Sequence, residues 1–127
     1  MATYADANDS IVTIALIETV EGLANLDSIL ETPGLDGVYL GASDLAVSHG
    51  GQPGIDYFSA DAAARHGTFL EAARRKGVKV CMHAQTDEDL RLCIEAGADF
   101  VTVATDAVAL QREAARQLGE ARRLAAA

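Results

Sequence analysis

Four apolar, strand-like runs, each followed by a helix-like segment, constrain the fold of this chain more than any other feature. The runs are IVTIALI at 11–17, GVYLGA at 37–42, VKVCMHA at 78–84 and DFVTVAT at 99–105. Continuous apolar runs rich in β-branched residues are typical of strands buried on both faces of a parallel sheet. Strands that alternate with helices in this way require parallel pairing, with the helices packed on the sheet.

The segments between these runs have the apolar spacing of amphipathic helices. We expect helices over 18–34, 61–76 and 86–98, and a final one after Asp106. Pro33 with Gly34, and Gly77, are typical residues at which such helices end, and Thr86 or Asp87 is the expected cap of the third. The final helix is expected to bury a stripe that consists of Leu110, Ala114, Leu118, Ala121 and Leu124.

Two α/β architectures fit four consecutive β-α units. One is an open, flavodoxin-like parallel sheet, and the other is half of a TIM-type (β/α)8 barrel. The length of 127 residues favours the open sheet, because a complete barrel has about 250 residues. No linker or low-complexity segment divides the chain, so residues 1–127 are expected to form a single domain.

Composition excludes several classes of partner. The formal net charge is −9 and no basic stripe interrupts the acidic pattern, so neither nucleic acid nor an anionic membrane is an expected partner. No apolar run reaches the roughly 18 residues of a membrane-spanning helix. The first ten residues, MATYADANDS, lack the features of an export signal, and Cys81 and Cys93 lie in apolar patterns typical of reduced core residues. A cytoplasmic location is therefore expected.

Two of the apolar runs lead directly into a carboxylate, Glu18 after the first and Asp44 after the second. Function gathers at the carboxyl ends of the strands in either architecture, and neighbouring strand ends lie side by side. Asp44 could instead cap a short helix beginning at Leu45. Glu18 is costly to desolvate unless a cation meets it, and no lysine or arginine lies at a strand end. A divalent cation, magnesium or manganese, would neutralise both acids.

The sequence also resembles the second half of the HpcH/HpaI aldolase and citrate lyase superfamily. The resemblance lies in ALIETVEGLANLDSIL followed by GLDGVYLGASDLAVSHG, and then in RRKGVKV and CIEAGADFVTVATDAVAL. It covers residues 4–118 and is strongest at the Ile-Glu and Gly-x-x-Asp-Leu pair. The family is a barrel whose fifth and sixth strands carry a metal-binding Glu and Asp. The resemblance therefore implies a partial, half-barrel aldolase domain with Glu18 and Asp44 as metal ligands.

The implied activity is metal-dependent cleavage of a 4-hydroxy-2-oxo acid into pyruvate, or a related 2-oxo acid, and an aldehyde. The implied cofactor is magnesium or manganese, with cobalt as a further candidate. Ser43 matches a position whose main-chain N–H contacts the substrate carboxylate in the family. Leu16 stands where many of the aldolases have a substrate-contacting Gln, whereas the acyl-CoA lyases often have an apolar residue there. An acyl-CoA or citrate lyase β-type enzyme therefore remains an alternative.

The first four strands of the family barrel, which carry its histidine base and an arginine, have no counterpart in this chain. His83, near the end of the third run, is expected to face the substrate pocket, although a structural role is the alternative. A half-barrel also has two open edges and an uncovered interior face. We therefore expect a homo-oligomer, or pairing with a separate N-terminal half. A non-catalytic half-barrel that binds metal and small oxo acids is a further alternative.

Overall fold

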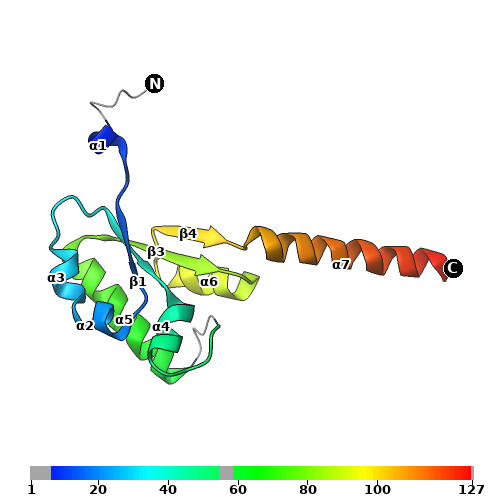
Figure 1. Ribbon diagram of the computed structural model, residues 1–127, viewed down its shortest axis with the longest axis horizontal. Coiled ribbons are helices and arrows are strands. Elements are labelled where there is room, and N and C mark those ends of the chain that lie inside the picture. Colours follow the sequence, from blue (N-terminus) through cyan, green and yellow to red (C-terminus); the bar gives the residue numbers. More distant parts are fainter. Residues whose placement is uncertain (1–6, 55–58, 127) are drawn as a thin grey trace.

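The computed structural model describes residues 7–54 and 59–126, so residues 55–58, in the segment between the second apolar run and the helix expected over 61–76, lie outside the described part. Eleven elements are present in these ranges (Figure 1): α1 (Ala7–Ser10), β1 (Ile14–Ile17), α2 (Val20–Ala24), α3 (Leu26–Leu30), β2 (Gly37–Leu40), α4 (Ala42–Ser48), α5 (Ala60–Lys76), β3 (Lys79–Ala84), α6 (Asp87–Glu95), β4 (Phe100–Val103) and α7 (Asp106–Ala125). Each predicted strand run contains one observed strand.

The four strands form one parallel sheet in the order β1-β2-β3-β4. A flavodoxin-like sheet would have its first strand between the second and third, so this order excludes that alternative. Helices α2 to α6 lie on one side of the sheet (Figure 1), and its other face carries no helix among the described residues. Sequential strands with helices on one side only are the arrangement of a barrel segment.

The core lies between the sheet and this helix layer. Side chains that alternate along the strands point into it, and Phe69 of α5 is completely buried among them. The strand members of this core are Ile17, Val38, Leu40, Val80, Met82 and Ala84. Because every second residue of each strand faces the helices, the remaining strand residues are directed to the uncovered face.

Local capping agrees with the predicted helix boundaries for α5 and α6. The Gly77 backbone is left-handed, with φ 69°, and it ends α5 where the sequence predicted. Thr86 is the N-cap of α6 and forms a reciprocal capping box, in which its hydroxyl accepts from the Asp89 N–H and the Asp89 carboxylate accepts from the Thr86 N–H.

The helix predicted over 18–34 is instead two short helices that meet at Asn25. The Asn25 side-chain amide donates to the Glu21 carbonyl, and the Ser28 hydroxyl donates to the Asn25 carbonyl. Such side-chain bonds to the main chain compete with regular helical pairing. The sequence offered a short helix after β2 only as an alternative that begins at Leu45, whereas the observed α4 begins three residues earlier, at Ala42.

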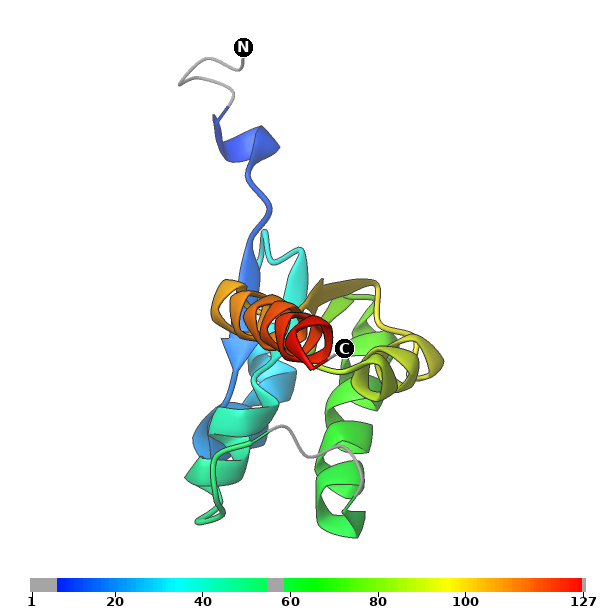
Figure 2. The same cartoon turned by 90° about the vertical axis from the view of Figure 1, so that its right-hand side faces the viewer.

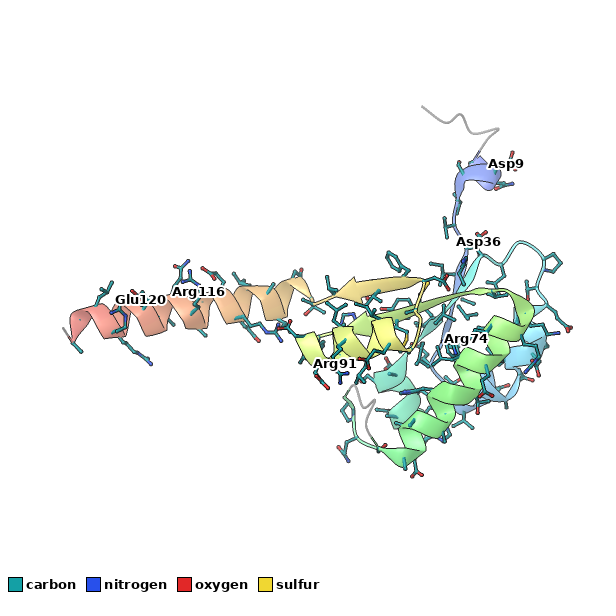
Figure 3. All side chains as sticks on the ribbon, turned by 180° about the vertical axis from the view of Figure 1, so that it is seen from behind. Asp9, Asp36, Arg74, Arg91, Arg116 and Glu120 are labelled. Carbon is teal, nitrogen blue, oxygen red and sulfur yellow. The ribbon has the colours of Figure 1, made fainter. Side chains whose placement is uncertain are left out.

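The predicted burial of two regions is wrong. The stripe on the final helix is exposed, since Leu110 is 73% and Leu118 59% accessible. Figures 1 and 2 show α7 extending away from the sheet, and Arg116 and Glu120 lie along this projecting helix in Figure 3. The outer strands are also exposed on the face away from the helices, where Leu16 of β1 is 52% and Phe100 of β4 is 54% accessible, whereas Cys81 of the inner strand β3 is buried there. The periodicity was correct, but no described segment covers these apolar surfaces.

Candidate metal and substrate site

The two predicted acids lie at neighbouring strand ends. Glu18 directly follows β1, and Asp44 is in the first turn of α4, which directly follows β2. The Gly41 N–H donates to the Ile17 carbonyl at 2.9 Å, which fixes the ends of the two strands beside each other. Glu18 is half-buried and Asp44 is exposed, so the pair lies where buried sheet meets solvent.

Gly41 is required by the path of the Glu18 side chain. A Cβ atom at position 41 would lie 2.6 Å from the Glu18 Cβ and 3.2 Å from its Oε2. The backbone of Gly41, with φ −83°, is one that any residue adopts, so the requirement is steric rather than conformational. The absence of a side chain here leaves room for the Glu18 carboxylate.

One pocket of about 300 Å³ contains every site residue that the sequence predicted. It is lined by Leu16, Glu18, Ser43, Asp44 and His83, together with Tyr39, Gly41, Gly54 and Gln85. The structure thus brings the predicted residues together at the carboxyl end of the sheet, which is the functional end of a parallel barrel. Metal and substrate binding by these residues remain predictions.

The capping alternative for Asp44 is wrong, because α4 begins at Ala42 with Gly41 as its N-cap, and no side chain caps it. Asp44 is therefore the third residue of the helix rather than the residue before it. The neighbouring Ser43 has a structural contact that the sequence did not predict, since its hydroxyl accepts from the Gly54 N–H at 3.0 Å. That bond holds the glycine-containing loop against the pocket.

The donor set fits a hard divalent cation. Magnesium is commonly held by one or two carboxylates, with waters and the substrate completing an octahedral oxygen shell. Glu18 and Asp44 supply two such carboxylates on one pocket. Within the described ranges, no cluster of three or more His, Cys, Asp or Glu side chains could enclose a metal by itself. A cation held here would therefore depend on waters or a chelating ligand.

His83 lies on the same pocket and belongs to a hydrogen-bonded network. Its Nδ1 is 2.8 Å from the Thr102 hydroxyl, which in turn is 2.5 Å from the Tyr39 hydroxyl. Sequence reasoning missed Tyr39 and Thr102. Both occupy positions directed to the uncovered face of the sheet, and that alternation was the signal that could have identified them.

A second cavity, of about 540 Å³, lies at the opposite end of the strands. Its lining is largely apolar and includes Ile14, Cys81 and Phe100, with the Lys79–Asp99 ion pair at one side. Burial, and then the nearby Asp99 carboxylate, raise the pKa of the Cys81 thiol. The amino ends of barrel strands serve stability rather than chemistry, so we assign function to the first pocket.

The fold and the pocket define an α/β protein of the TIM-barrel type, represented here by half a barrel with an acidic site at its carboxyl end. The family model described as HpcH/HpaI aldolase/citrate lyase matches residues 2–113. The chain belongs to this family. No helix among the described residues is both long and apolar enough to cross a membrane.

Individual relatives agree with this assignment. The chain is 36% identical over 120 residues to a hydroxypyruvate/pyruvate aldolase of Rhizorhabdus wittichii, covering 94% of this chain and 48% of that protein. A family protein from Burkholderia cenocepacia J2315 superposes with a TM-score of 0.84 at 30% identity, covering 93% of this chain and 45% of that one. The chain thus spans about half the length of the curated relatives it matches.

A more distant solved structure is the citrate lyase beta subunit of M. tuberculosis in complex with oxaloacetate and magnesium. It superposes with a TM-score of 0.58 at 26% identity, covering 76% of this chain and 48% of that one. The family therefore includes a relative whose structure contains both a 2-oxo acid and a divalent cation.

Proposed function

We propose that this chain is the metal- and substrate-binding half of a carbon–carbon lyase that cleaves 4-hydroxy-2-oxo acids to pyruvate, or a related 2-oxo acid, and an aldehyde. The observation that carries the proposal is the convergence of Glu18 and Asp44 on one pocket at the carboxyl end of the sheet. The names of the aldolase relatives and the magnesium complex of the citrate lyase relative support it.

In this proposal Glu18 and Asp44 hold a divalent cation, magnesium, manganese or cobalt. The cation, when bound, offsets the negative charge of a 2-oxo acid and of the enolate that forms from it. The chain itself supplies the space above Gly41, the apolar wall at Leu16 and the first turn of α4, where the main-chain N–H of Ser43 is the proposed contact for the substrate carboxylate. Among these, Leu16 is the contact that separates the possible subfamilies.

The apolar Leu16 favours a second candidate, an acyl-CoA or citrate lyase β-type enzyme. Its side chain is 52% accessible and lines the pocket, where it offers no hydrogen bond to a 2-oxo acid. A non-catalytic half-barrel that binds metal and oxo acids is the third candidate. Cleavage of a 4-hydroxy-2-oxo acid, compared with cleavage of an acyl-CoA substrate, distinguishes the three.

We further propose that the working protein is an assembly, either a homo-oligomer or a pair with a separate N-terminal half. The outer strands β1 and β4 each have one unpaired edge, and the uncovered face exposes Ile14, Leu16 and Phe100. Exposed apolar surface of this kind marks an interface. We place this assembly in the cytoplasm, because Cys81 and Cys93 are buried thiols.

The metal proposal is tested by titrating the purified chain with Mn²⁺, with and without oxalate, which is a stable 2-oxo acid mimic. Glu18→Gln and Asp44→Asn should each abolish saturable binding, while far-UV circular dichroism remains that of the wild type. Glu21→Gln is the matched control for the first variant, and Asp87→Asn, in the first turn of α6, is the control for the second. Unchanged binding in both pocket variants would exclude the proposed site.

The assembly proposal is tested by sedimentation and by complementation. We expect the chain to self-associate and to cleave 4-hydroxy-2-oxo acids slowly by itself, because the base and arginine of its relatives lie outside the half that it matches. Adding the N-terminal half of a related aldolase should raise cleavage by about 10²–10⁴-fold, the usual contribution of positioned proton transfer. A stable monomer that is fully active alone contradicts the proposal.

A further inference from the structure

The strand register places three pocket residues and Thr102 in one row across the sheet. The ladder pairs Leu16 with Tyr39, Tyr39 with Cys81, and His83 with Thr102. Two residues further along each strand, the same register aligns Glu18 with Gly41 and Gly41 with His83. The row therefore reads Glu18, Gly41, His83, Thr102, and its members are directed to the same, uncovered face.

Gly41 leaves a gap in the middle of this row. Glu18 and His83 are two strand spacings apart, roughly 10 Å between main chains, and the residue between them in the row, Gly41, has no side chain. Both line the same pocket, as does Asp44. A small ligand held by the two carboxylates above Gly41 would therefore have the imidazole of His83 as its neighbour on the β3 side.

The network behind His83 fixes the orientation of its ring. The Thr102 hydroxyl donates to the Met82 carbonyl through a long contact of 3.5 Å, which leaves two lone pairs on its oxygen. With the Thr102 hydroxyl as donor to Met82, these lone pairs are satisfied if the Tyr39 hydroxyl, at 2.5 Å, and the Nδ1–H tautomer of His83, at 2.8 Å, both donate to the Thr102 oxygen. A neutral ring with its proton on Nδ1 has its lone pair on Nε2, which is then the nitrogen able to take a proton.

We propose that His83 is a catalytic residue that carries a proton to and from a 2-oxo acid bound at the Glu18–Asp44 pair, and that Thr102 and Tyr39 position it. This inference rests on the proposed function. It gives the chain a proton carrier of its own, distinct from any group supplied by a front half.

In the cleavage direction, the C4 hydroxyl gives its proton to a base of the front half, the C3–C4 bond breaks, the aldehyde leaves, and the electron pair of that bond forms the enolate of the 2-oxo acid. The imidazolium form of His83, which has taken a proton from solvent, then donates it from Nε2 to C3, and His83 is left neutral. The base of the front half returns the hydroxyl proton to solvent, so no other reactant is consumed. With pyruvate alone, reversible proton transfer between His83 and C3 exchanges the methyl protons with solvent. This half-reaction is therefore measurable without an aldehyde.

The first arm of the test determines which ring nitrogen of His83 carries the proton in the metal-free protein. ¹⁵N-detected NMR of the wild type should show His83 protonated at Nδ1 at a pH where the ring is neutral. Thr102→Val keeps the β-branched shape but removes the acceptor, so it should shift the proton to Nε2. Tyr39→Phe, which removes only one hydroxyl, should change the His83 signal less. An unchanged tautomer in Thr102→Val would overturn the positioning role.

The second arm follows exchange of the pyruvate methyl protons in D₂O with Mg²⁺ present. His83→Gln should lower the exchange rate by about 10²–10⁴-fold, while Mn²⁺–oxalate affinity stays within about threefold of the wild type. His49→Gln, which changes an exposed histidine that does not line this pocket, is the matched control and should leave both quantities unchanged.

The two proposals fail in different ways. If the wild type binds Mn²⁺ and oxalate but His83→Gln exchanges protons as fast as the wild type, the role of His83 is overturned and the metal site stands. If the wild type binds neither, both proposals are overturned. Slow exchange accompanied by an equal loss of oxalate affinity would make His83 a binding group and would also overturn its role as proton carrier.

Discussion

Replacing Gly41 with alanine tests the close approach on which the site depends. The new Cβ would lie 2.6 Å from the Glu18 Cβ and 3.3 Å from the Leu16 Cδ1. Carbon atoms pack best at about 3.5–4.0 Å, so the first contact is too short by roughly 1 Å. Neither Cβ can rotate away because each is bonded to the main chain. The ends of β1 and β2 must therefore separate.

The expected loss is about 1–3 kcal/mol in the free energy of unfolding, the usual range for overpacking. Displacing Glu18 should also weaken Mn²⁺–oxalate binding by about 10–100-fold, as when the groups that orient a metal ligand are removed. Urea denaturation measures the first quantity and calorimetric titration the second.

Gly67→Ala is the matched control, because a Cβ at that position of α5 meets nothing within 4 Å. It should stabilise the protein by up to about 1 kcal/mol, since alanine is the better helix former. The free energy of unfolding should thus fall in Gly41→Ala and rise in Gly67→Ala. If Gly41→Ala unfolds within about 0.5 kcal/mol of the wild type and binds oxalate normally, the Glu18 side chain does not pass over Gly41 as described.

Three further perturbations test other parts of the molecule. Leu16→Gln should tighten oxalate binding by one hydrogen bond, about 1 kcal/mol or roughly fivefold in Kd, and calorimetry showing no gain would favour the acyl-CoA lyase branch. Leu110→Glu combined with Leu118→Glu should weaken self-association in sedimentation if α7 contributes to the interface, and an unchanged distribution would exclude that contribution. The Lys79 ammonium holds the pKa of the Asp99 carboxyl below its usual range, so this carboxylate stabilises the fold above about pH 4 and loses that effect as the pH falls through its lowered pKa. Asp99→Asn should therefore reduce the loss of unfolding free energy that the wild type shows as the pH falls below about 4. If the variant and the wild type have the same dependence of stability on pH, the Lys79–Asp99 pair is without effect.

The sequence predicted the elements well because the signals for them are local. Runs of β-branched residues marked each strand, and Gly77 and Thr86 marked helix boundaries that the structure confirms. The same local logic placed Glu18 and Asp44 at neighbouring strand ends. Asn25 shows the limit of this local reasoning. The apolar spacing of the predicted helix was continuous, but the Asn25 side chain bonds to the main chain at the point where the helix is divided in two.

What could not be predicted depends on contacts distant in sequence. The Tyr39–Thr102 hydrogen bond joins residues 63 positions apart, and nothing in either strand alone indicates it. The stripe on α7 was identified correctly as apolar, but its periodicity carries no information about which surface covers it. Burial on one or two faces of the sheet is likewise a property of the assembly rather than of the strand sequence.

The strand order also determines how this polypeptide acquires its structure. Each strand pairs only with its immediate neighbours in the chain, so every ladder closes over a single intervening segment. Loop closure is therefore modest at each step, and the sheet can grow outward from any formed pair, much as repeat arrays do. Folding should be rapid for a parallel sheet. Truncation at a unit boundary should remove one strand and its helix while the remaining ladders stay intact.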